Sequence, residues 1–246
     1  MVHASLRTIG LAGSHFGPGG AEMLLDVLES VVGPAGTLMM VIGTDYALDW
    51  VNRRPQADRA ALLEGTDPID LAAAAANPEL GWLAEAFRQR PGTIVSHNPS
   101  GRFAARGARA EELMHGHPWN DYYGAGSPLH KLCEQGGSIL RLGADRDTVT
   151  ALHYAEYVAR LPDKRRTRWD YRIATPAGPR HLWVECLDDD GGIRSWQDED
   201  YFAVILKKYL SSGRARMGWV GEAPAELIEA ADIVRFGAKW MEDNLR

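Results

Sequence analysis

Cysteine and long apolar runs are both scarce in this sequence, and each shortage excludes a class of protein. The 246 residues include 2 cysteines, Cys133 and Cys186, which are far apart. They form neither a disulfide framework nor a zinc-ligand pattern, so we expect a reducing, cytoplasmic compartment. The best apolar run, Leu38 to Ile42, is far shorter than the ~20 residues of a membrane helix. The chain also opens without a charged and apolar leader, so we expect neither a membrane span nor a signal peptide.

Positive charge is not in excess either. The sequence has 33 acidic and 27 basic residues, for a formal net charge of −6. This balance gives no general attraction to nucleic acid phosphates, so we expect no nucleic acid partner. Hydrophobic residues at 45% and charged residues at 24% are globular values, which exclude disorder, collagen and coiled coil. Because no repeat or linker divides the chain, we expect one domain over residues 1–246.

Helical and strand patterns alternate along the chain. Apolar residues at helical spacing predict helices over 23–31, 79–90, 128–136, 147–161, 201–210 and 232–245. Other runs predict strands over 37–43, 138–142, 167–175 and 181–187, with a turn entering a short strand over 95–107. Residues 44–78 are irregular, apart from a short helix expected over 72–76. Helices interleaved with strands and one hairpin indicate an α/β fold with a mixed sheet.

The helix expected over 147–161, with Asp147 as its N-cap, holds the first candidate site. His153 and Glu156 are three residues apart, so they project from the same face, together with Thr150. A carboxylate beside an imidazole raises its basicity and fixes its orientation, which is what a general base near neutral pH needs. An ordinary half-exposed helix face remains the alternative. A metal site is disfavoured because no second ligand pair accompanies this one.

Charges of opposite sign separate in the C-terminal half of the chain. Seven basic residues lie between 160 and 180, against Asp163 and Asp170. Seven acidic residues follow: Glu185, Asp188, Asp189, Asp190, Asp198, Glu199 and Asp200. A dense acidic loop can bind a polycationic small molecule, because several carboxylates each pair with an ammonium group. The loop lacks the spaced ligands of an EF-hand, so calcium is disfavoured, and a solvated surface is the ordinary alternative.

The opening of the chain is the third candidate site. Ser5, Arg7 and Thr8 offer hydrogen-bond donors, and the glycines of 13–20 permit close backbone approach before a helix N-terminus. Such a loop can hold phosphates. It matches neither the P-loop nor the dinucleotide-binding pattern, so an ordinary glycine-rich connection is the alternative.

Two further patterns give weaker indications of function. His115 and His117 flank a glycine and are expected to form a solvated loop pair. Ser5, Ser100 and Ser127 are the serines considered for a hydrolase, but the sequence has no Gly-x-Ser-x-Gly elbow.

Taken together, several stretches resemble the aminoglycoside 3-N-acetyltransferase family, the antibiotic N-acetyltransferases that do not have the GNAT fold. The similar stretches are 2–10, 32–39, 126–129, 142–157, 161–166 and 232–242. The most specific of them is LGADRDTVTALHYAEY over 142–157. The resemblance implies a single-domain, three-layer αβα sandwich around a mixed sheet. It also implies acetyl transfer from acetyl-CoA, without a metal, to the 3-amino group of a 2-deoxystreptamine aminoglycoside, which confers antibiotic resistance.

The resemblance further implies roles for individual residues. His153 falls on the catalytic histidine of the family and Glu156 on its partner, so the amine would attack acetyl-CoA directly, with His153 as general base. Contacts to CoA are implied at Ser5, Leu6, Arg7, Thr8 and Ser127. Acids that face the antibiotic are implied at Asp45, Glu185, Asp188, Asp189 and Asp190.

Some departures from the family pattern bear on the substrate. Val95 replaces an arginine of the family, and Arg102 adds a cation that would repel a polycation if it lined the pocket. After Asp45 the chain has Arg53 and Arg54, where the family often has acidic residues between aromatic ones. An acetyltransferase of a non-antibiotic amine and a non-catalytic CoA-binding descendant are therefore the alternatives. We expect a monomer or a homodimer.

Another departure concerns the first residues. Relatives carry a helix and a loop before the strand that ends at Val-His-Ala-Ser, and this sequence begins inside that strand. We therefore expect the N-terminal helix of the family to be absent here. Lower stability, repacking or self-association would follow, unless the true start lies upstream.

Overall fold

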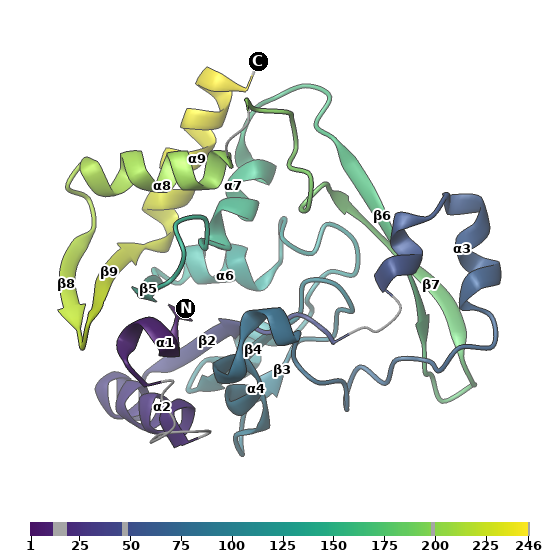
Figure 1. The fold of residues 1–246 in the computed structure, drawn as a ribbon, viewed down its shortest axis with the longest axis horizontal. Helices are drawn as coiled ribbons and strands as arrows, with labels where there is room; N and C mark the ends of the chain where they lie inside the picture. Colours follow the sequence, from purple (N-terminus) through teal and green to yellow (C-terminus); the bar gives the residue numbers. More distant parts are fainter. Residues whose placement is uncertain (12–18, 46–48, 198–199, 246) are drawn as a thin grey trace.

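The computed structural model describes residues 1–11, 19–45, 49–197 and 200–245, and it confirms the α/β class (Figure 1). Four strands form a mixed sheet in the order β1 (Val2–Ala4), β5 (Ser138–Leu142), β9 (Ala223–Glu229) and β8 (Arg216–Val220). Strand β1 runs parallel to β5, whereas β9 runs antiparallel to both of its neighbours. A parallel pair together with antiparallel pairs makes this sheet mixed, as expected. The hairpin that was expected to make it mixed, over 167–175 and 181–187, forms a separate two-stranded sheet instead.

A second, antiparallel sheet lies beside the first. Its order is β2 (Thr37–Val41), β4 (Phe103–Gly107) and β3 (Ile94–Val95), and β2 contacts β1. Alternate residues of β2 enter different cores, because strand side chains point to opposite faces. Leu38 and Met40 belong to one hydrophobic core and Met39 to the other. The sheets therefore separate two cores, which gives the three layers that the resemblance implies.

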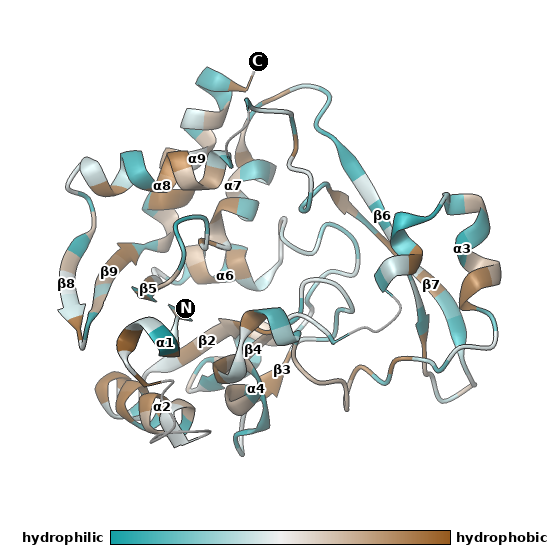
Figure 2. Ribbon diagram, viewed as in Figure 1, coloured by the Kyte–Doolittle hydropathy of each residue, from teal (hydrophilic) through white to brown (hydrophobic). Residues whose placement is uncertain are grey.

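Helices cover both faces of these strands. One core is closed by α1 (Leu6–Ile9), α2 (Gly19–Val32) and α4 (Trp82–Gln89). The other is closed by α5 (Ala110–Met114), α6 (Pro128–Glu134), α7 (Ala151–Val158), α8 (Tyr201–Ser211) and α9 (Ala230–Asn244). Figure 2 shows apolar residues concentrated along α2 and α8. None of the helices in the described ranges is long and apolar enough to cross a membrane.

A long hairpin projects from the layered part of the molecule (Figure 1). It consists of β6 (Arg166–Ile173) and β7 (Arg180–Leu187), and α3 (Gln56–Leu63) and the 3-10 helix η1 (Asp49–Arg53) pack on β6. The amide of Asn52 bonds both backbone groups of Asp170, at 2.7 and 3.2 Å. The buried carboxylate of Asp170 forms ion pairs with Arg59 and Arg168. The irregular segment after β2 is thereby fixed to the hairpin.

Several sequence expectations about local structure are wrong. Helix α7 is capped by Thr150 rather than Asp147, makes no side-chain capping bond, and ends at Val158. The helix expected over 72–76 is a turn, and the helix of this segment is α3. A short 3-10 helix, η2 (Pro78–Leu80), precedes α4. The sequence patterns missed α1, α5 and the hairpin of β8 and β9.

Candidate active site

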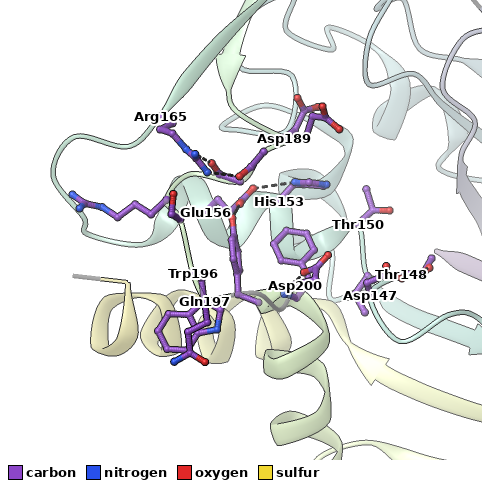
Figure 3. Close-up of a pocket in the computed structure, with 18 residues that line it drawn as sticks. Asp147, Thr148, Thr150, His153, Glu156, Arg165, Asp189, Trp196, Gln197 and Asp200 are labelled. Carbon is purple, nitrogen blue, oxygen red and sulfur yellow. Dashed lines mark hydrogen bonds and ion pairs between the residues drawn. The ribbon is translucent and has the colours of Figure 1, made fainter. Parts of the chain in front are cut away.

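The histidine and glutamate predicted as a pair meet on the first turns of α7. The Nδ1 atom of His153 lies 2.9 Å from Oε2 of Glu156. The glutamate side chain is 2% exposed, whereas that of the histidine is 20% exposed. The carboxylate is therefore buried, whereas the imidazole still reaches solvent. Figure 3 shows the bond that joins the two side chains.

Two aromatic rings hold the imidazole of His153 in place. Tyr123 stacks on it with ring centroids 4.8 Å apart and an interplanar angle of 11°. Phe202 packs against it edge-on, also at 4.8 Å and with an angle of 64°. Since Nδ1 is used by Glu156, Nε2 is the ring nitrogen that can exchange a proton with a ligand.

The second carboxylate oxygen of Glu156 has a partner that the sequence analysis missed. The hydroxyl of Tyr201 donates to Oε1 and accepts the backbone N–H of Ile193 at 3.1 Å. The ammonium of Lys164 donates to the backbone carbonyl of Glu156 at 2.6 Å. The carboxylate thus has one fixed partner at each oxygen.

The surroundings of His153 raise the pKa of its imidazole above the ordinary value. Burial lowers the pKa, but the hydrogen bond and the charge of Glu156, with the charges of Asp189 and Asp200, outweigh it. Burial and the nearby glutamate raise the pKa of Tyr201, which therefore remains a proton donor at neutral pH. A basic imidazole fixed by a carboxylate is suited to take a proton from a bound ligand.

A cavity of about 680 Å³ lies in front of this pair. Its walls are the loop 147–150, the segment 189–197 and the start of α8 (Figure 3). Two guanidinium groups, Arg165 and Arg194, contribute to the lining. We call this space the dyad cavity, because both His153 and Glu156 border it.

A second cavity, of about 720 Å³, is also lined by the loop that follows β7. Its lining carries the carboxylates of Asp45, Asp49, Glu79, Asp188, Asp189 and Asp190. Trp169 and Tyr171 supply aromatic walls, and Arg53 supplies a cation. We call this space the acidic cavity. The carboxylates of its lining can attract a compact polycation.

Asp189 belongs to both cavities. Its carboxylate accepts hydrogen bonds from the hydroxyl of Tyr122 and, at 3.3 Å, from Nε1 of Trp169. Burial raises the pKa of Asp189, against the opposing effects of His153 and these hydrogen bonds. Asp190 and Gly191 are also shared. The loop carrying these residues therefore borders both cavities.

The structure brings together four of the five acids singled out by the resemblance. Asp45, Asp188, Asp189 and Asp190 line the acidic cavity. Glu185 lies outside both cavities; its side chain is exposed and its backbone N–H donates to Asn120 at 2.9 Å. Asp198 and Glu199 lie outside the described residues.

The residues proposed for CoA form a small cap at the end of β1. The hydroxyl of Ser5 accepts from the backbone N–H and the hydroxyl of Thr8, at 3.3 and 2.9 Å. Gly143 lies against Thr8, because a Cβ at this glycine would be 2.8 Å from that side chain. Thus Ser5, Leu6, Arg7 and Thr8 adjoin the loop that leads from β5 to the dyad cavity, without lining the cavity themselves. Most of the glycine-rich stretch 13–20 lies outside the described residues.

Ser127 does not join the other proposed CoA residues. It is fully buried, and its hydroxyl accepts the backbone N–H of His130 at 3.1 Å, which caps α6. It lines neither cavity. The geometry assigns this hydroxyl to the helix.

Arg102 lines neither the dyad cavity nor the acidic cavity, so it is not the cation in the pocket wall that the sequence suggested. Its side chain is 0% exposed, and its guanidinium donates to four backbone carbonyls. These belong to Gly43, Leu71, Ala74 and Ala75, at 2.6 to 3.0 Å. Burial lowers the pKa of Arg102 to about 10, so it remains a cation at neutral pH. Its role is to hold the segment that follows β2.

The expected solvated histidine pair is wrong for His117. This residue is buried and binds the hydroxyl of Ser96 and the carbonyl of Tyr122, at 2.9 and 2.8 Å. Burial lowers the pKa of His117 to about 4, so its imidazole is neutral. His115, by contrast, is exposed as expected.

An α/β fold whose cavity is bordered by a hydrogen-bonded His–Glu pair is typical of an enzyme, and comparisons with known proteins identify its family. The model of the family described as aminoglycoside 3-N-acetyltransferase matches residues 1–242. Aminoglycoside N(3)-acetyltransferase VIII of Streptomyces fradiae is 35% identical over 252 residues, which cover 100% of this chain and 86% of that protein. The chain belongs to the aminoglycoside 3-N-acetyltransferase family, and the resemblance seen in the sequence is confirmed.

Solved structures give the same result for the fold. The binary complex of AAC-IIIb with CoASH is 37% identical, with a TM-score of 0.87 over 99% of this chain and 89% of that one. Sisomicin-bound AAC-VIa is 33% identical, with a TM-score of 0.87 over 99% of this chain and 90% of that one. The expected fold class is therefore confirmed.

Proposed function

We propose that this chain transfers an acetyl group from acetyl-CoA to the 3-amino group of a 2-deoxystreptamine aminoglycoside, and thereby inactivates the antibiotic. The observation that carries the proposal is the hydrogen-bonded pair of His153 and Glu156 at a cavity that shares part of its lining with a second, acidic cavity. Family membership and the names of the relatives support the same reaction.

The proposed chemistry begins with the removal of a proton from the acceptor amine. An ammonium group has no lone pair, so the acceptor first loses one proton to solvent and becomes a free amine. The neutral imidazole of His153 then takes the second proton at Nε2 as this amine attacks the thioester carbonyl. The new C–N bond forms, the C–S bond breaks, and the departing thiolate of CoA takes a proton from the imidazolium. Glu156 orients the ring and stabilises the imidazolium between these steps. The amine attacks directly, so no acyl-enzyme is required.

The two cavities suggest where the two substrates bind. We place the aminoglycoside in the acidic cavity, where several carboxylates can each pair with an ammonium group and aromatic rings can cover the sugar faces. We place the acetyl thioester in the dyad cavity, next to His153, with Arg165 and Arg194 as the cations available to CoA. Residues 5–8, beside the loop after β5, remain proposed CoA contacts.

One observation favours a second acceptor class. Arg53 places a guanidinium among the carboxylates of the acidic cavity, which reduces its attraction for a highly charged antibiotic. A less cationic amine outside the antibiotics is therefore the alternative acceptor of the same reaction.

We also propose one domain over 1–246 and a cytoplasmic location. The same central strands contribute to both major cores, which supports one domain. Cys133 and Cys186 are both free thiols, which suits a reducing compartment.

The proposal is tested by measuring release of free CoA with gentamicin, tobramycin, kanamycin, neomycin and apramycin. We expect release with at least one of them. We expect His153→Ala to abolish turnover while the antibiotic still binds, measured by calorimetry. His115→Ala is the matched control, because this histidine is 82% exposed and lies outside both cavities. A folded enzyme that releases no CoA with any of the five would refute the proposal.

A further inference from the structure

The carboxylate of Glu156 is shared between two donors on different elements. Oε2 faces His153 on the same helix, whereas Oε1 accepts from Tyr201, the first residue of α8. The hydroxyl of Tyr201 accepts in turn from the backbone N–H of Ile193. A hydrogen-bonded chain therefore runs from the main chain through the tyrosine and the glutamate to the imidazole.

The structure holds Tyr201 closely in this chain. The carboxylate of Asp200 caps α8 by accepting the backbone N–H of Phe202 at 2.6 Å. Gly192 lies against the tyrosine ring, since a Cβ there would be 2.8 Å from Cε1 and 2.9 Å from the hydroxyl. With a φ of +72°, Gly192 also occupies the left-handed region that favours glycine. The hydroxyl is thus directed at the glutamate from a fixed position.

We propose that Tyr201 is a positioning residue for the acetyl transfer. Its hydroxyl holds Oε1 of Glu156 and takes up part of the carboxylate charge, so that the imidazole of His153 can release its proton in each turnover. The inference rests on the proposed function.

The direction of the effect follows from the charge states of the pair. A buried carboxylate with no donor besides the imidazole would bind the imidazolium proton tightly, and the neutral base would be scarce. When the imidazole is neutral, no imidazolium balances the negative charge of the Glu156 carboxylate. The hydrogen bond from Tyr201 therefore stabilises the carboxylate most in this state. Losing this bond therefore raises the apparent pKa of the pair as a unit.

Other charged groups face the pair and stay in place when the tyrosine is changed. Asp189, after β7, and Asp200, before α8, both favour the imidazolium. Lys164 approaches the backbone of Glu156, and Tyr123 covers the imidazole ring. Tyr201→Phe removes one oxygen atom and leaves these groups unchanged.

The first test is the pH dependence of kcat/KM. At low pH, kcat/KM falls because the base becomes protonated, and we call this part of the profile the acid limb. We expect the acid limb of Tyr201→Phe to move to a higher pH by about one unit, since a hydrogen bond to a charged group is lost. We expect Glu156→Gln to move it downward, because the charge that favours the imidazolium is gone. In the Glu156→Gln background, Tyr201→Phe should no longer move the limb upward.

Tyr209→Phe is the matched control. Tyr209 lies on the same helix, and its hydroxyl donates to Asp232 at 2.9 Å, outside both cavities. This variant loses a similar tyrosine–carboxylate bond, so any general effect on packing should appear in it as well. We expect its acid limb to coincide with that of the unchanged enzyme.

A second readout does not depend on activity. The titration of the His153 imidazole can be followed by NMR and assigned by its absence in His153→Ala. We expect its midpoint to rise in Tyr201→Phe and to stay unchanged in Tyr209→Phe. If no acceptor is acetylated, the proposed function fails, while this titration still decides the role of the tyrosine. A midpoint that is unchanged or lower in Tyr201→Phe would overturn the inference.

Discussion

Replacing Arg102 separates a structural role of this cation from an electrostatic role in substrate binding. The guanidinium is fully buried and donates to four backbone carbonyls between residues 43 and 75. One of these, that of Ala75, also accepts the backbone N–H of Asp45 at 3.1 Å. Arg102→Met therefore removes the group that holds the segment carrying Asp45 into the acidic cavity.

The size of the effect can be worked from these four contacts. Three of the four carbonyls lose their donor, because that of Ala75 keeps the N–H of Asp45. Each buried acceptor left without a partner costs roughly 1–3 kcal/mol. The loss is partly offset, because a guanidinium no longer has to be buried and water can reach some of the carbonyls. We expect Arg102→Met to lower the free energy of unfolding by about 3–5 kcal/mol, which is the lower part of the range that three such acceptors give. Arg102→Lys keeps the charge with fewer donors, so about half of this loss is expected.

The assays are urea unfolding and steady-state kinetics. We expect the unfolding midpoint to fall in the order arginine, lysine, methionine. We also expect the KM for the aminoglycoside to rise in Arg102→Met while that for acetyl-CoA stays near its original value. If Arg102 instead repelled the substrate, its removal would lower the aminoglycoside KM. That result, or a stability loss below about 1 kcal/mol, would show that Arg102 does not hold this segment in place.

Further predictions concern the acidic cavity and the packing behind it. Asp189→Asn should raise the aminoglycoside KM and move the acid limb of kcat/KM downward, because the carboxylate charge that raises the pKa of His153 is lost; an unchanged limb would contradict this. Raising the ionic strength from about 0.05 to 0.5 M should raise the aminoglycoside KM of the unchanged enzyme, since salt screens exposed charges; a falling KM would argue against carboxylate recognition. Gly101→Ala should lower the unfolding free energy by about 1–3 kcal/mol in thermal unfolding, because a Cβ would lie 2.2 Å from the Tyr122 ring, whereas Gly218→Ala has open space and should change it little.

The central pair was predictable because it is local in the sequence. A spacing of three on one helix places His153 and Glu156 on the same face whatever surrounds them. Tyr201 is 45 residues away from Glu156 and Tyr123 is 30 residues from His153. Such partners are set by how α8 and the loop before α6 pack, which no local pattern records.

The elements that were predicted wrongly or missed have similar causes. The alanine run over 72–76 has good helix formers, but so short a helix leaves most of its carbonyls without an internal partner. Arg102 instead binds the carbonyls of Ala74 and Ala75. Strand β8 is exposed along its whole length, so it shows no alternation of apolar and polar residues for sequence analysis to detect. In both cases contacts between distant segments decide the local structure.

The most direct test of the proposed function is to identify the product formed from acetyl-CoA and an accepted aminoglycoside. The reaction is followed by CoA release, and the product is examined by mass spectrometry and NMR. We expect a single added acetyl group on the 3-amino nitrogen with the unchanged enzyme, and none with His153→Ala, which still binds the antibiotic. An acetyl group on another nitrogen, or equal turnover by His153→Ala, would contradict the account.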